Sequence, residues 1–140
     1  MALVVDASVA AKWLIEEDGS DAALALLERD EPLIAPSLIL LEVASVLWKR
    51  CRVGGISAAE GRSALAALEG YFAELVPDQD LVGSAFTIAL VLDHPVYDCL
   101  YLALTAARDC RLVTADARLL ARLVKSPHRD RVMPLQDWPG

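Results

Sequence analysis

Short apolar runs alternate along the chain with longer segments in which apolar residues recur every three or four positions. A run of three or four apolar residues that ends at a turn-forming residue is typical of a strand buried on both faces. Pro134 lies within the last of these runs and lacks a backbone N–H, so we expect that strand at an edge of its sheet. The predicted strands are 3–5, 33–35, 74–76, 111–114 and 132–135.

The longer periodic segments predict amphipathic helices, several of which begin at a recognisable cap. Ser8 and Ser37 precede periodic segments as candidate N-caps. Ser57 and Glu60 have the spacing of a capping box, and Gly54–Gly55 ends the helix before it. The predicted helices cover about 9–16, 20–29, 38–52, 58–70, 80–92, 98–108 and 117–125.

The order of these elements indicates the fold class. Short apolar strands that alternate with helices form a parallel sheet covered on both faces. We therefore expect an α/β fold of three layers, α/β/α, with about five short strands in a central parallel sheet. The length of 140 residues suits one domain, residues 1–140. Sites in such sheets lie at the carboxyl ends of the strands, where the strand order reverses.

Composition adds expectations about location and assembly. Hydrophobic residues make up 56% of the chain, which predicts thorough burial, an oligomer interface, or both. Every apolar run is too short to cross a bilayer, and residues 1–6 lack the basic start of a signal peptide. Cys51, Cys99 and Cys110 are an odd number without zinc-site spacing, so we expect reduced thiols and a cytoplasmic protein.

Four acidic residues occupy positions that favour a shared site. Asp6 follows the first predicted strand, and Asp116 follows the fourth with one residue between. Glu42 lies inside the most apolar helix, and Asp98 begins another largely apolar helix. A buried carboxylate needs a partner, and several carboxylates at one point need a cation. Carboxylate oxygens suit Mg²⁺ and Mn²⁺.

Each acid also has a simpler structural explanation. Asp6 would shape a strand-to-helix turn, and Asp98 and Asp116 are good N-caps. Glu42 lies in the middle of a helix, where capping does not explain it, although Lys49 two turns later offers an ion pair. The joint occurrence of the four acids therefore carries the signal.

Four sequence blocks resemble the acidic motifs of the PIN-domain family. They are Asp6-Ala-Ser-Val, Glu42-Val-Ala-Ser-Val-Leu, Tyr97-Asp98-Cys-Leu-Tyr-Leu-Ala-Leu and Leu112-Val-Thr-Ala-Asp116, in the family's order and approximate spacing. The single-domain length and the phrase Lys12-Trp13-Leu14 resemble the VapC-type toxins within that family. Cys99 departs mildly from the pattern, since a small residue such as alanine is common there, and we interpret it as a buried small hydrophobe.

The resemblance implies a PIN-like, Rossmann-like fold and endonucleolytic cleavage of RNA. It implies that one or two Mg²⁺ or Mn²⁺ ions are held by the four acids, with Ser8 and Thr114 as further groups that hold water or orient ligands. For Ser8 we favour the simpler role of an N-cap. His94 and His128 lack the spacing of a zinc site, and neither is placed for metal-free acid–base catalysis. The metal-dependent route would leave a 5′-phosphate and a 3′-hydroxyl. The expected catalytic and metal-binding residues are Asp6, Glu42, Asp98 and Asp116.

The resemblance also implies partners. It predicts the toxin of a type II toxin–antitoxin pair, a homodimer, and an antitoxin bound on the helices within 37–70. A basic antitoxin side chain directed at the acids would also explain the net charge of −7. Lys49, Arg50 and Arg52 end one of these helices, where they complement the helix C-terminus or contact RNA phosphates.

Other acidic α/β families fit less well. A receiver-type phosphoacceptor needs an aspartate after the third strand and a lysine near the last, and Asp78 and Lys125 match poorly. A haloacid-dehalogenase-type phosphatase needs D-x-D, but its third position here is Ser8, and neither a Walker loop nor G-x-G-x-x-G occurs. A catalytically inactive PIN-like module that binds RNA or protein stays open as the alternative. Metal-dependent RNA cleavage by the pure protein distinguishes the two.

Overall fold

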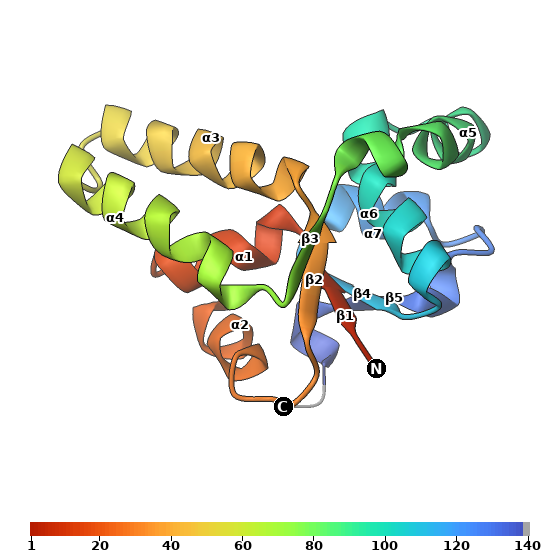
Figure 1. Ribbon diagram of the computed structural model, residues 1–140, viewed down its shortest axis with the longest axis horizontal. Helices are drawn as coiled ribbons and strands as arrows, with labels where there is room; N and C mark the ends of the chain where they lie inside the picture. The colour runs from red at the N-terminus through yellow and green to blue at the C-terminus, as the bar shows by residue number, and fades with distance from the viewer. Residues whose placement is uncertain (139–140) are drawn as a thin grey trace.

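Residues 1–138 contain five strands that form one parallel sheet in the order β3-β2-β1-β4-β5, which confirms the predicted α/β fold class (Figure 1). The structure is a computed structural model and describes residues 1–138. Its strands are β1 (Leu3–Val5), β2 (Leu33–Pro36), β3 (Glu74–Val76), β4 (Arg111–Thr114) and β5 (Val132–Pro134). Pro134 lies on the edge strand β5, as its missing N–H requires.

The central position of β1 decides where the strand order reverses. β1 pairs with β2 on one side, with Leu3 opposite Leu33, and with β4 on the other, with Val5 opposite Val113. All residues of β1 and β2 are buried, which explains why their sequences read as continuous apolar runs. The chain leaves β1 toward β2 and β3 and later returns beyond β1 to form β4 and β5. The carboxyl ends of β1 and β4 therefore flank the switch point.

Helices cover both faces of the sheet. In Figure 1, α1 to α4 lie on one side of the strands and α5 to α7 on the other. The bounds are α1 (Ala7–Leu14), α2 (Ser20–Leu26), α3 (Leu38–Arg52), α4 (Ala58–Leu68), α5 (Val82–Leu92), α6 (Val96–Arg108) and α7 (Ala117–Arg122). Within residues 1–138 there are also four short 3-10 helices, η1 (Glu69–Tyr71), η2 (Asp78–Asp80), η3 (Arg129–Arg131) and η4 (Leu135–Asp137).

Four predicted helices are longer than those observed. Helix α5 begins at Val82 rather than at residue 80, after η2, and the other three end early because their last turns tighten into i→i+3 bonds. After α2, the N–H of Leu27 bonds to the carbonyl of Leu24, and that of Arg29 bonds to the carbonyl of Leu26. Such short bonds replace the α-helical pattern. Similarly, η1 replaces the last turn predicted after Leu68, and α7 ends at Arg122 rather than near residue 125.

The start of α1 corrects the prediction that Ser8 is its N-cap. The N-cap is Asp6, whose backbone is extended. Its side-chain oxygen Oδ1 accepts a hydrogen bond from the N–H of Val9. Aspartate accepts this bond as well as serine does, so the helix begins two positions earlier than the hydroxyl suggested. Ser8 lies within the first turn, where its hydroxyl is free to bond elsewhere.

A second correction concerns the start of α3. Ser37 holds the N-cap position but makes no side-chain capping bond. Asp78 of η2 instead accepts the N–H of Leu38 at 2.9 Å, while Ser37 Oγ accepts the N–H of Asp78 at 3.2 Å. The cap of α3 therefore comes from a segment that follows β3. The capping box predicted for Ser57 and Glu60 is confirmed.

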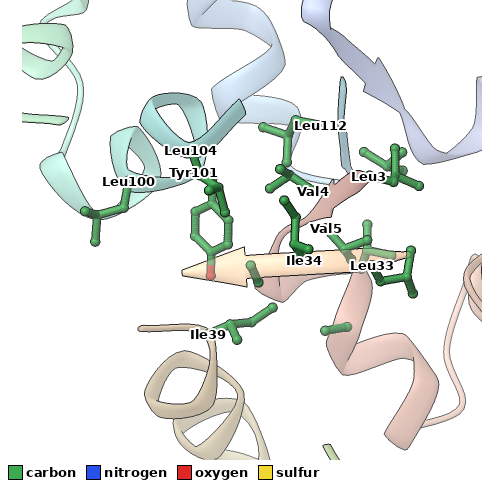
Figure 2. Packing of buried hydrophobic residues seen from close by; sticks show 14 of the residues in the cluster. Leu3, Val4, Val5, Leu33, Ile34, Ile39, Leu100, Tyr101, Leu104 and Leu112 are labelled. Carbon is green, nitrogen blue, oxygen red and sulfur yellow. The ribbon is translucent and has the colours of Figure 1, made fainter. Parts of the chain in front are cut away.

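The core lies between the sheet and the helices on either face. Val4 and Leu112 are fully buried in the neighbouring strands β1 and β4. Tyr101 of α6 is buried as well, and Figure 2 shows its ring reaching from α6 toward the end of β2, with Ile39 of α3 beyond it. Its hydroxyl thus lies near the carboxyl edge of the sheet. Within residues 1–138, each helix taken singly falls short of the length and apolar character needed to span a membrane.

Candidate functional site

The four predicted acids are carried by elements that meet at the carboxyl ends of the strands. Asp6 follows β1 directly, and Asp116 follows β4 with one residue between. These strands are neighbours at the point where the strand order reverses. Glu42 lies on α3, which begins after β2, and Asp98 lies in the first turn of α6.

Asp6 is the most enclosed of the four acids, with 6% of its surface exposed. Its Oδ1 accepts the hydroxyl of Ser8 at 2.5 Å and the N–H of Val9 at 3.2 Å, and its Oδ2 accepts the hydroxyl of Thr114. Burial nevertheless raises the pKa of Asp6 from 3.8 to about 6, because these bonds only partly replace lost hydration. The charge of Asp116 adds to the rise.

Ser8 and Thr114 connect Asp6 to the end of β4. Ser8 Oγ accepts the N–H of Ala115 at 2.9 Å, and Thr114 Oγ1 accepts the N–H of Asp116 at 3.0 Å. Both hydroxyls therefore donate to the Asp6 carboxylate and accept from the chain that leads into Asp116. This arrangement fixes the turns after two adjacent strands relative to each other.

Asp116 is the N-cap of α7, as its simpler explanation predicted. Its Oδ1 accepts the N–H of Arg118 at 2.9 Å and the N–H of Leu119 at 3.3 Å. Its Oδ2 has no hydrogen-bond partner within residues 1–138. Capping thus uses one carboxylate oxygen and leaves the other available to a ligand.

Glu42 bonds to the buried tyrosine of α6 rather than to Lys49. Tyr101 donates its hydroxyl to Glu42 Oε1 at 2.6 Å. Burial raises the pKa of Glu42, the bond from Tyr101 opposes that rise, and the charges of Asp98, Asp78 and Asp116 increase it. The Glu42 carboxylate therefore lies in a region of negative potential to which other acids contribute.

Asp98 is paired with the histidine four positions before it in the chain. His94 Nε2 lies 2.6 Å from Asp98 Oδ2, and only 6% of the histidine side chain is exposed. The prediction that Asp98 caps its helix is wrong, because α6 begins at Val96 with Pro95 as its N-cap. Proline lacks an N–H and enters a helix readily at its start, so the helix begins two residues earlier.

The four acids influence one another electrostatically without forming a closed ligand cage. Asp116 raises the pKa of Asp6, and Asp98 and Asp116 raise that of Glu42. Across residues 1–138, no three His, Cys, Asp or Glu side chains form a group that could hold a metal ion. The shared ligand set therefore stays a prediction. The donor chemistry fits a hard divalent cation, since all four groups offer carboxylate oxygens and two have raised pKa values.

Three residues at this edge were not identified as site residues from the sequence: Tyr101, His94 and Asp78. Tyr101 follows Asp98 by three positions, which places both on one face of α6. This spacing in the sequence could have identified Tyr101 as a residue near Asp98. His94 precedes Pro95, which suggested a loop, and Asp78 reaches Leu38 across 40 positions. Only the tertiary structure shows those two contacts.

The titration of Asp6 predicts a specific pH dependence of stability. The folded chain holds the Asp6 proton more tightly than the unfolded chain, so protonation of Asp6 adds to the free energy of unfolding at low pH. This stabilisation is lost as pH rises from about 4 to about 6. Asp6→Asn removes the titration. In EDTA, the free energy of unfolding of the variant relative to the parent should rise by about 3 kcal/mol from pH 3 to pH 8.

Urea titrations at several pH values measure this difference. Asp18→Asn, at an exposed position, is the matched control and should show a difference that does not change with pH. A constant difference between Asp6→Asn and the parent across the whole range would contradict the raised pKa.

The Tyr101–Glu42 bond predicts a coupling between two helices. Tyr101→Phe should lower the free energy of unfolding by about 1.5–3 kcal/mol, because it removes a hydrogen bond to a charged group. In a double-mutant cycle with Glu42→Gln, the combined loss should be smaller than the sum of the single losses. Tyr71→Phe removes a hydroxyl that has no hydrogen-bond partner within residues 1–138 and should change stability little. Additive losses in the cycle would show that the bond does not form in solution.

Comparison with known proteins places the chain in a family. Residues 3–125 match the PIN domain. The chain is 33% identical over 121 residues to Ribonuclease VapC3 of Pyrobaculum aerophilum, an alignment that covers 85% of this chain and 92% of that protein. The PIN domain match runs through the segments that carry Asp6, Glu42, Asp98 and Asp116.

Solved structures show the same fold. The crystal structure of PAE2754 from Pyrobaculum aerophilum has a TM-score of 0.72 at 21% identity, covering 97% of this chain and 85% of that one. VapBC2 from Rickettsia felis, crystallised with a DNA fragment from the promoter, has a TM-score of 0.66 at 16% identity, covering 99% of this chain and 100% of that one. Sequence and fold therefore agree that the chain belongs to the PIN domain family and is related to the VapC ribonucleases.

Proposed function

We propose that the chain is a metal-dependent endoribonuclease, the toxin of a type II toxin–antitoxin pair. The carrying observation is the buried Asp6 carboxylate at the junction of β1 and β4, which the hydroxyls of Ser8 and Thr114 hold beside the chain that leads into Asp116. A protein that keeps an acid in such a place loses stability, and perturbed carboxylates concentrate at functional sites. The relationship to VapC ribonucleases supports RNA as the substrate.

In this proposal Asp6, Glu42, Asp98 and Asp116 hold the ion. When bound, Mg²⁺ or Mn²⁺ supplies positive charge that activates a water for attack and stabilises the charge on the phosphate. The chain's own contribution is to orient the carboxylates. Ser8 and Thr114 fix Asp6, Tyr101 fixes Glu42, and His94 fixes Asp98, each through a hydrogen bond to a carboxylate oxygen. Such supporting bonds restrict the orientation of ligand side chains.

Among residues 1–138, His94 is the one histidine beside these acids, and its contact with Asp98 supports a positioning role. Its Nε2 faces Asp98 Oδ2, and its side chain is largely buried. His128, the second histidine, lies in a turn near η3 and is not bonded to any of the four acids. Hydrolysis that relies on the carboxylates would leave a 5′-phosphate and a 3′-hydroxyl, as expected from the sequence.

A catalytically inactive binding module is the second candidate. The observation that favours it is that, among the described residues 1–138, the acids do not form a group that could hold a metal ion. The retention of all four acids, two of them with raised pKa values, favours the nuclease. RNA cleavage decides between the two.

The proposal extends to location and partners. Residues 1–140 would act as one domain, in the cytoplasm, where the free thiols of Cys51, Cys99 and Cys110 stay reduced. The VapBC2 structure supports an antitoxin partner. A groove between α3 and α4, lined by Leu40, Leu41 and Leu65 among others, offers an apolar surface for it.

Cleavage is the direct test of the nuclease. The pure protein should cut a labelled single-stranded RNA in Mn²⁺ and lose that activity in EDTA. Asp98→Asn and Asp116→Asn should lose cleavage, whereas Asp18→Asn at an exposed position should cut like the parent. Mn²⁺ at about 100 Kd should raise the parent's free energy of unfolding by about 2.7 kcal/mol.

The two variants should gain much less stability from Mn²⁺ than the parent does. Thermal melts with and without Mn²⁺ measure the gain. Variants that gain as much as the parent, and that keep cutting RNA, would show that these aspartates act as structural groups only.

A homodimer is expected from the exposed apolar face of α5. Val82, Phe86 and Leu90 recur every four residues and are each more than half exposed. Sedimentation or light scattering should find a dimer for the parent and a monomer for Phe86→Asp/Leu90→Asp. Arg62→Asp/Arg111→Asp, at exposed polar positions, is the control and should stay dimeric. The protein concentration should be about 100 times a typical micromolar Kd for dimerisation. A parent that remains monomeric at that concentration would contradict the prediction.

A further inference from the structure

A basic cleft lies beside the acids on the far side of the sheet from α3. Its volume is about 540 Å³, and α7 and the residues before α6 form its walls. Three cationic side chains of this region, Arg118, Arg122 and Lys125, line it together with His94 and Pro95. Arg118 and Arg122 are four residues apart on α7, which places them next to each other on one helix face.

Within residues 1–138, the side chains of the three cations have no carboxylate partners. Of the ten other Lys and Arg side chains in residues 1–138, five form ion pairs with carboxylates and five do not. Within the same residues, Arg118, Arg122 and Lys125 take part in none, and all three are exposed. A chain with a net charge of −7 thus gathers unpaired positive charge in one hollow. A concave surface lined by one sign of charge concentrates ligands of the opposite sign.

The cleft is connected by direct bonds to two of the four acids. His94 lines the cleft and contacts Asp98 Oδ2 at 2.6 Å. Arg118 also lines it, and its backbone N–H is bonded to Asp116 Oδ1 at 2.9 Å. A polyanion with one phosphate at the acids would therefore have the cations within reach of the next part of its chain.

We propose that this cleft binds the phosphodiester backbone of the RNA next to the cleaved phosphate. The inference rests on the proposed function and adds where the substrate strand runs. The planar forks of two arginines suit phosphate oxygens, and the lysine adds a point charge. The cations compensate for the repulsion between RNA and the acids. The cleft contacts phosphates and no bases, so its contribution to affinity is independent of the RNA sequence.

Binding without cleavage tests the cleft directly. The probe is a fluorescein-labelled single-stranded RNA of about twelve nucleotides, measured by anisotropy in EDTA at several salt concentrations. Arg118→Gln/Arg122→Gln should weaken binding at least tenfold at low salt. It should also reduce the slope of log K against log salt by about 1.4, or about 0.7 for each lost phosphate contact.

Arg62→Gln/Arg111→Gln is the matched control, because it removes the same charge from exposed arginines outside the cleft. It should bind RNA within about twofold of the parent. Lys125→Gln is an independent variant, placed after α7, and should reduce the slope by about 0.7. Equal binding by the parent and both cleft variants, or an equal loss in the control, would overturn the proposal.

The outcome separates this inference from the nuclease itself. Binding that depends on the cleft but no cleavage in Mn²⁺ would support the cleft and contradict the proposed function. Cleavage in Mn²⁺ with binding unaffected by the cleft variants would support the nuclease and contradict the cleft. A twelve-residue polyglutamate peptide that binds the cleft as tightly as the RNA would also overturn the assignment, because it would identify the ligand as an acidic protein segment.

Discussion

The buried carboxylate of Asp6 is the constraint on which the rest of this edge of the molecule depends. It ends β1, caps α1 and accepts the hydroxyls of Ser8 and Thr114, so one side chain joins a strand, a helix and the neighbouring strand β4. Its pKa is raised to about 6 because burial removes more hydration than these bonds replace. The fold therefore loses stability by keeping the ionised carboxylate of Asp6 buried at this junction.

Glu42 and Asp98 are also held by hydrogen bonds from neighbouring side chains. Tyr101 donates to Glu42 from a helix on the opposite face of the sheet, and His94 contacts Asp98 across one turn at the start of α6. In each case a largely buried side chain holds one carboxylate oxygen. The remaining oxygens are the ones that the proposed cation would bind, and the supporting bonds would then restrict the orientation of its ligands.

Charge is distributed unevenly over the chain, and this distribution matters for the proposed binding of RNA. A net charge of −7 opposes RNA binding in general. The acids at the strand ends account for part of it, and the cations of α7 lie directly beside them. Local charge next to the site therefore matters more to a polyanionic substrate than the total does, because screening in salt limits interactions to about 10 Å.

The sequence by itself determined the class of fold and indicated the four acids as candidate site residues. Only the tertiary structure decided what each acid contacts. The apolar runs predicted β3 and β4 with their observed bounds, and Ser57 with Glu60 predicted a true capping box, because these signals depend on neighbours in the chain. Tyr101 meets Glu42 across 59 positions and Asp78 caps α3 across 40. Such contacts follow from the strand order β3-β2-β1-β4-β5, which brings the carboxyl ends of distant strands together and which local periodicity does not encode.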